Sequence, residues 1–102
     1  MKKPLALLFF ITAVLITACT AKYRIVNGCE IRPKTQCSRT HLSETELRWA
    51  QLRWADLRGA DLRGAKLGGA SLLGNLRRAI YNKTTKFPDG FDPETVWMIL
   101  TE

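Results

Sequence analysis

Apolar positions in the centre of the chain recur every five residues. Seven consecutive units carry leucine at this position, and Cys37 stands in phase before them. The leucines are Leu42, Leu47, Leu52, Leu57, Leu62, Leu67 and Leu72. A small residue lies two positions earlier in each unit: Thr35, Thr40, Thr45, Ala50, Ala55, Ala60, Ala65 and Ala70. The pattern continues unbroken through eight units, from Thr35 to Gly74, and predicts a repeat architecture.

A period of five fits neither regular helix nor straight strand. On an α-helix, five residues advance by a net angle of about 140°, so the leucines would scatter around the cylinder. In a strand, successive leucines would point to opposite faces. The small residue and the leucine of one unit both stay inside only if the chain turns a corner once per unit. Glycines two residues after a leucine suit such corners, because they adopt a positive φ without strain. These are Gly59, Gly64, Gly69 and Gly74. Four right-angle corners close a coil, so we expect a square solenoid filled by leucine ladders.

Residues 54–68, which read WADLR-GADLR-GAKLG, resemble the A-[D/N]-L-x-x repeat of the pentapeptide-repeat family. The resemblance implies an all-β fold, a right-handed quadrilateral β-helix with four pentapeptides per coil. Eight units then make about two coils. Residues 27–31 together with Cys37 are similar to an N-terminal cap of the family, and residues 79–93 to a frequent C-terminal ending.

The five-residue spacing shortens by one residue after Leu72. Continuing by five would place an apolar residue at position 77, but that residue is arginine and the leucine is Leu76. Tyr81 then resumes the spacing. We interpret this shortened unit as the point where the chain leaves the regular coils.

The C-terminal residues predict a short helix. Asp92 suits the N-cap, and Pro93 and Glu94 suit the first turn. Val96, Trp97 and Leu100 would then share a face that covers the open end of the last coil, whose exposed edge would otherwise aggregate. In some relatives such ends mediate dimers, so the resemblance also raises the expectation of a homodimer.

The first 18 residues have the order of a signal peptide. Lys2 and Lys3 precede an apolar stretch over residues 5–18, interrupted only by two threonines. This stretch is shorter than the roughly 20 residues of a membrane-spanning helix. Residues 15–19, LITAC, resemble a bacterial lipobox, which implies that Cys19 becomes the diacylated first residue of the mature protein. Ordinary cleavage after Ala21 and a retained helix are the alternatives.

The residue after the cysteine bears on the destination of the protein. Thr20, and not an aspartate, follows Cys19. By resemblance to enterobacterial sorting rules, this favours the outer membrane. We therefore expect a lipid-anchored protein of the bacterial cell envelope that faces the periplasm.

Cys29 and Cys37 remain after lipidation of Cys19, eight residues apart in a compartment where disulfides persist. We expect them to form a disulfide. Free buried thiols are one alternative. A metal site is another, although two cysteines and the distant His41 do not supply four ligands.

Length and charge limit the classes of protein that remain. A chain of 102 residues is long enough for one small domain, which excludes a multidomain enzyme and a polytopic membrane protein. We expect a signal peptide over 1–18, a tether and cap over 19–34, the solenoid over 35–81 and a C-terminal cap over 82–102. The formal net charge is +7.

Arginine follows leucine in four consecutive units, and tryptophan follows arginine in two of them. In a four-sided coil these arginines occupy one side each. Arginine beside tryptophan suits an anionic ligand or a protein contact; the alternative is a solvated surface. The candidate binding residues are Arg48, Trp49, Arg53, Trp54, Arg58 and Arg63.

Catalytic constellations have little support in this sequence. His41 precedes a leucine and should point outward, and Ser38 and Ser43 have no evident partner carboxylate. Asp56 and Asp61 occupy the acidic position of the repeat, where the resemblance implies a structural role. We expect no enzyme, no cofactor and no metal site.

Two functions remain from different classes. The first is a lipid-anchored envelope protein that acts as a structural or protein-interaction module. The second is a binder of an anionic envelope ligand, such as lipopolysaccharide phosphate or cell-wall glycan. Some relatives mimic DNA and protect gyrase, but they are strongly acidic, whereas this chain is basic and carries an export segment. Direct nucleic-acid binding suits the charge but not the expected compartment.

Overall fold

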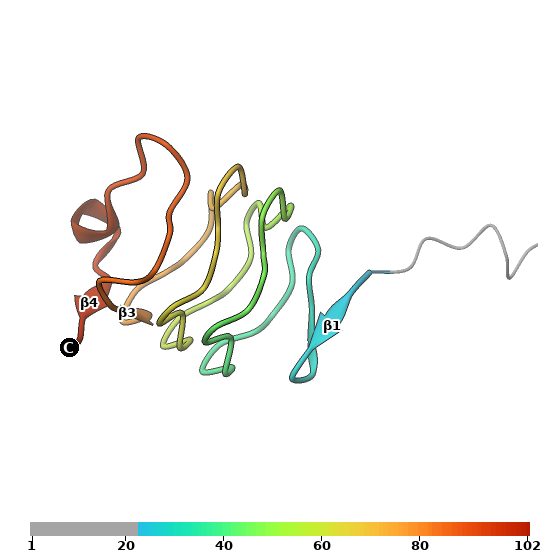
Figure 1. Cartoon of the computed structure of the whole chain (residues 1–102). Coiled ribbons are helices and arrows are strands. Elements are labelled where there is room, and N and C mark those ends of the chain that lie inside the picture. Colours follow the sequence, from blue (N-terminus) through green and yellow to red (C-terminus); the bar gives the residue numbers. More distant parts are fainter. Residues whose placement is uncertain (1–22) are drawn as a thin grey trace, which may run out of the picture.

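The computed structural model describes residues 23–102, which wind into a solenoid composed mainly of turns and short β-bridges. Figure 1 shows the successive loops of the chain stacked along one axis, from β1 (Ile25–Val26) at one end to β3 (Ile80–Tyr81) and β4 (Ile99–Leu100) at the other. The expected signal peptide and Cys19 lie outside the described residues.

Parallel bridges join positions 19 or 20 residues apart and so hold successive passes of the chain together. Four five-residue units therefore complete one coil. On one side Gln36, Asp56 and Asn75 stack, and on the next side His41, Asp61 and Ile80. The two remaining sides pair Glu46 with Lys66 and then Lys86, and Gln51 with Ser71. Each of these bridges is isolated, so the sides are ladders of single bridges and not a closed sheet.

The side chains expected inside the solenoid are buried. All seven repeat leucines and Cys37 are at most 7% exposed, which confirms the inward register. Ala55, Ala60 and Ala65 lie beside them with almost no exposed surface. The alternation within each unit thus produces a core of stacked leucines lined by small residues.

The corners of the solenoid adopt a positive φ, as the glycine spacing predicts. Gly59, Gly64 and Gly69 have φ values of 68°, 71° and 70°. The corresponding corners of the preceding coil carry side chains and adopt the same conformation, at a cost of roughly 1–2 kcal/mol for each non-glycine residue. The residues that correspond to the three glycines are Arg39, Glu44 and Trp49. Lys34 and Trp54 have the same conformation at the remaining corner.

The prediction that Gly74 is a corner residue with a positive φ is wrong. This glycine is not among the residues with a positive φ; instead, a Cβ at this position would lie 2.4 Å from the backbone oxygen of Ala55. Its N–H donates to the Leu72 carbonyl over 2.8 Å, and the next N–H, of Asn75, donates to the Ala55 carbonyl over 2.9 Å. The shortened unit is accommodated by this tight turn against the preceding coil.

The expected exit from the coils at the shortened unit is also wrong. Asn75 and Ile80 still pair with the preceding coil, and Lys66 pairs with Lys86. β4 then pairs in parallel with β3, with Ile99 opposite Ile80. Winding therefore continues beyond residue 81, where we placed the start of the cap, because the tight turn shortens one side without interrupting the ladders.

The N-terminal end is a small hairpin. β1 pairs antiparallel with β2 (Cys29–Glu30) across Asn27 and Gly28, which both have positive φ. This is the conformation that a two-residue Asn-Gly turn favours. Cys29 is bonded to Cys37, with 5.5 Å between their Cα atoms. The disulfide joins the hairpin to Cys37, which occupies the position that leucine fills in the later units.

The C-terminal end is filled mainly by aromatic side chains. The ring of Phe87 packs edge-on against Tyr81 at 5.3 Å and is stacked on Phe91 at 5.1 Å. The helix η1 (Pro93–Val96) is a single 3-10 turn capped by Asp92, whose carboxylate accepts from the Glu94 N–H. It ends at Trp97, whose φ of 64° redirects the chain into β4.

The expected covering face differs in the structure. Trp97 and Leu100 are exposed, and Met98 is the residue of this segment that is buried. The physical reason is the left-handed conformation of Trp97, which ends the helix before residues 96, 97 and 100 can share one face. Among residues 23–102, no helix has the length and apolar character that crossing a bilayer requires.

Candidate interaction surface

Three of the four predicted arginines form ion pairs within their own repeat unit. Arg58 donates two hydrogen bonds to the Asp56 carboxylate, at 2.8 and 2.7 Å. Arg63 likewise donates two hydrogen bonds to the Asp61 carboxylate, at 2.9 and 2.7 Å. The units place aspartate and arginine on either side of an inward leucine, so both project from the same side of the coil. These arginines are therefore engaged locally.

The two aspartates are held in their charged form by these contacts. The Arg58 guanidinium lowers the pKa of the Asp56 carboxyl, mainly through its hydrogen bonds, and Arg63 does the same for Asp61. The pKa of each arginine is raised in return. Arg48 makes a longer ion pair with Glu46, 3.4 Å from nitrogen to oxygen. The structural role inferred for the aspartates fits these contacts.

Arg53 differs because its unit carries Gln51 in the acidic position. Its guanidinium carbon lies 5.7 Å from the centre of the Trp54 ring, and the Lys34 ammonium lies 6.0 Å from the same ring. Both cations are placed for interaction with the electron-rich face of the indole. Trp54 thus stands at a corner between two positive charges.

Among residues 23–102, Trp49 is the most exposed large apolar residue, at 75%. A Cβ on Gly69, one coil further along, would lie 2.3 Å from its ring, so the indole extends over the bare corner of the next coil. Trp54 is 63% exposed and Leu73 is 64% exposed. Trp54 and Leu73 are neighbours across coils, and Trp49 is at the adjacent corner; we call these three residues the apolar edge.

A shallow groove of about 810 Å³ is lined by one residue of the apolar edge, Leu73. Its walls are residues 70–74, residues 88–92, and Thr95 and Val96. Leu73 belongs both to the edge and to this groove. The apolar edge therefore continues into a hollow between the second coil and the C-terminal loop.

One side of the solenoid holds a set of arginines that sequence reasoning did not select. We define the basic face as residues 34–39, 54–59 and 73–78, three successive passes joined by the Gln36, Asp56 and Asn75 bridges. A groove of about 570 Å³ on this face is lined by Ser38, Arg39, Arg58, Gly59, Arg77 and Arg78. Of these, only Arg58 was among the predicted surface residues. The sequence signal for this set of arginines is their spacing of about 20 residues. The spacing can be recognised only if the shortened unit is counted as part of the coil.

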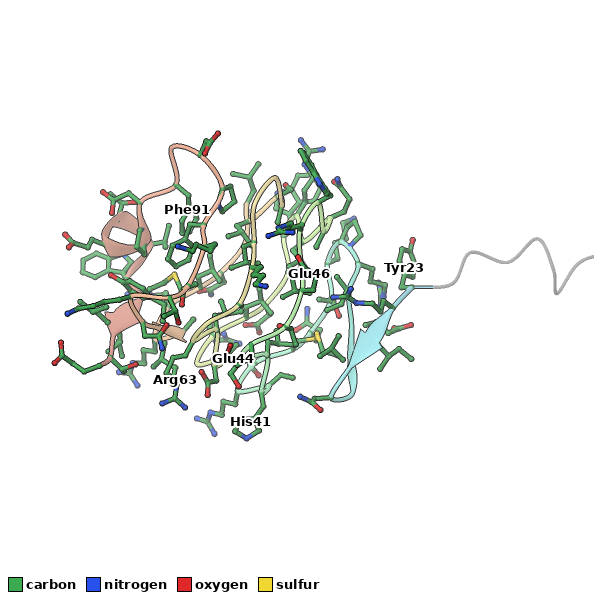
Figure 2. All side chains as sticks on the ribbon, viewed as in Figure 1. Tyr23, His41, Glu44, Glu46, Arg63 and Phe91 are labelled. Carbon is green, nitrogen blue, oxygen red and sulfur yellow. A yellow bond between two sulfur atoms is a disulfide. The ribbon has the colours of Figure 1, made fainter. Side chains whose placement is uncertain are left out.

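Among the residues considered for catalysis, His41 and Asp61 lie opposite each other in adjacent coils. His41 is exposed, and the Asp61 carboxylate accepts two hydrogen bonds from Arg63. Figure 2 shows His41, Glu44 and Arg63 along one side of the solenoid. Within the described part of the chain, no three His, Cys, Asp or Glu side chains gather in a way that could hold a metal ion.

Five-residue units, inward leucines and stacked coils define a solenoid repeat protein. Residues 33–59 match the family model described as Pentapeptide repeats, in eight copies. The chain is a pentapeptide-repeat protein, as the resemblance indicated. The repeats of this family imply a right-handed β-helix, and its members are generally structural or interaction modules and not enzymes.

A solved structure of a pentapeptide repeat protein from Nostoc PCC 7120 is also similar to this chain. The sequences are 23% identical, the alignment covers 67% of this chain and 82% of the Nostoc chain, and the TM-score is 0.29. The search of curated proteins found no match.

Proposed function

We propose that this protein is a non-enzymatic, lipid-anchored module of the bacterial envelope that binds a protein partner. The observation that carries the proposal is the apolar edge, where two tryptophans and a leucine are each more than 60% exposed. Soluble surfaces seldom leave several large apolar side chains together unless they meet a partner. Tryptophan and arginine are also the residues most enriched at binding hot spots, and Arg53 lies against Trp54.

The anchor part of the proposal rests on the sequence. The LITAC segment at residues 15–19 supports lipidation of Cys19, and Thr20 supports the outer membrane, with the solenoid facing the periplasm. The solenoid, which begins after the disulfide-linked hairpin and ends with the pairing of β4 to β3, then presents its sides to the envelope. The short tether between Cys19 and β1 keeps these sides close to the membrane.

The anchor is tested by non-reducing intact mass on protein extracted from fractionated membranes. The expected mass begins at Cys19, includes a diacylglycerol group, and lacks the two hydrogens of the thiols at Cys29 and Cys37. A chain that keeps residues 1–18, or one cleaved after Ala21, contradicts the lipid anchor.

The partner is tested by photo-crosslinking in the native envelope from a probe at Arg53, next to the edge. The double variant Trp49→Ala, Trp54→Ala should lose the crosslinked species. Trp97→Ala is the matched control, because Trp97 is 67% exposed but lies at another corner. A crosslink between two copies of the chain would identify the partner as a second copy. Equal crosslinking by all variants contradicts the role of the edge.

A second candidate function is binding of an anionic envelope ligand. The observation that favours it is the charge distribution. The basic face contains five basic side chains and one acidic side chain, Asp56, so its net charge is +4. The basic residues are Lys34, Arg39, Arg58, Arg77 and Arg78. Residues 23–102 contain thirteen basic and nine acidic side chains, which is also +4. The other sides and both ends are therefore neutral in sum.

A further inference from the structure

The arginines of the basic face come from three different passes of the chain. Backbone hydrogen bonds set their register: the Arg39 N–H donates to the Arg58 carbonyl over 2.8 Å, and the Gly59 N–H donates to the Arg77 carbonyl over 3.0 Å. The Arg78 N–H donates to the Trp97 carbonyl over 2.9 Å. Adjacent strands in such ladders lie about 4.8 Å apart. Arginines separated by about 20 residues in the sequence therefore become neighbours.

The corner of this face alternates between arginine and glycine. Arg39, Gly59 and Arg78 occupy the same corner in successive passes, and all three have a positive φ. Gly59 contributes no side chain, and a Cβ there would lie 3.3 Å from the Cγ of Arg39. The Arg39 side chain therefore extends over Gly59. This glycine and the two corner arginines all line the 570 Å³ groove.

Most of the positive charge in this groove is uncompensated. Of its four arginines, only Arg58 takes part in one of the four ion pairs found among residues 23–102. Arg77 instead lies with its guanidinium carbon 5.9 Å from the centre of the Trp97 ring. That contact restricts the side chain without neutralising it. Three guanidinium groups remain available for an added anion.

We propose that this groove binds a phosphate group, either free or on a lipid headgroup. Guanidinium groups present planar pairs of N–H donors that match phosphate oxygens, and they keep their charge at all physiological pH values. The Ser38 hydroxyl at the groove wall adds a neutral donor. A bound phosphate would offset the mutual repulsion of Arg39, Arg77 and Arg78. The proposal rests on the second candidate function and names its chemistry and its site.

The site differs from the four arginines selected by the sequence pattern. Arg48 and Arg63 lie on other sides of the solenoid and pair with Glu46 and Asp61. Replacing them removes the same charge as replacing Arg39 and Arg78. The double variant Arg48→Gln, Arg63→Gln is therefore a matched control for Arg39→Gln, Arg78→Gln. Glutamine keeps a long side chain at each corner and leaves the buried core untouched.

The test is isothermal titration calorimetry on the full chain in neutral detergent micelles. One arm uses inorganic pyrophosphate as the probe, and the other uses phosphatidic acid dissolved in the same micelles. Binding of pyrophosphate indicates a free phosphate as the ligand, and binding of phosphatidic acid alone indicates a lipid headgroup. The affinity should fall with added sodium chloride, because salt screens exposed charges.

We expect Arg39→Gln, Arg78→Gln to weaken binding by about tenfold or more, since each charge-assisted hydrogen bond contributes about that factor. Arg48→Gln, Arg63→Gln should change the affinity less than about threefold, because it removes no contact to the anion. If the unsubstituted protein binds neither probe, the second candidate function fails together with the site. If it binds but only the Arg48 and Arg63 variant loses affinity, anion binding stands and the proposed groove is wrong.

Discussion

Truncation of Leu57 to alanine tests the inward register of the solenoid most directly. Leu57 is 2% exposed, and its neighbours along the axis are Cys37 in the preceding coil and Leu76 in the following one. Leu→Ala substitutions in protein cores cost about 2–5 kcal/mol, and the cost rises with the cavity that remains. Cys37 is held by the disulfide and Leu76 by the ladder, so little collapse into the cavity is available. We therefore expect about 3–5 kcal/mol.

The matched control is Leu73→Ala, the same chemical change at a leucine that is 64% exposed. Its expected effect on the free energy of unfolding is within about 0.5 kcal/mol. Urea unfolding followed by tryptophan fluorescence measures both, with equal slopes required for the comparison. Leu57→Lys should leave no folded population, because an ammonium group cannot be buried there without a partner. Equal losses for the two alanine variants would refute the register on which the fold description depends.

Three further predictions follow from particular contacts. The pKa of the Asp61 carboxyl is lowered in the folded state, so its ion pair stabilises the protein above about pH 4. This stabilisation is lost as the pH falls through the lowered pKa. The variant Asp61→Asn should therefore show a smaller decrease of melting temperature at acid pH than the unsubstituted protein. Gly74→Ala should cost about 1–3 kcal/mol in a thermal melt because its Cβ would meet the Ala55 backbone, whereas Gly68→Ala, with 4.0 Å to its nearest atom, should be neutral or slightly stabilising. Cys29→Ser opens a loop of eight residues and should lower the free energy of unfolding by about 2–3 kcal/mol in urea, and an unchanged midpoint would show that the disulfide does not constrain the unfolded chain.

The repeat units made the core predictable from the sequence. Each unit carries its own inward leucine, small partner and corner residue, so the pattern depends on local geometry alone. The burial of Leu57 and the positive φ of Gly59 follow from it directly. The ion pairs of Arg58 and Arg63 were also visible in principle, because aspartate stands two residues before each arginine. The repeat pattern predicts a structural aspartate and an outward arginine in each unit, but it does not predict the contact between them.

The sides of the solenoid could not be assigned in the same way. Which residues meet across coils depends on the number of residues per coil, and one tight turn at Gly74 changes that number from 20 to 19. Arg39 and Arg78 share a corner only because the ladders continue through this turn. Similarly, Trp97 contacts Arg77 because its left-handed conformation ends the helix early.

The five-residue unit, the composition of the core and the class of fold can therefore be predicted from the amino-acid sequence. The extent of the winding and the pairing of the arginines on the basic face follow only from the contacts between coils. The physical reason is the range of the interactions. Inward and outward alternation is set within two or three residues, whereas the register between coils is set by backbone hydrogen bonds and packing between residues about 20 positions apart.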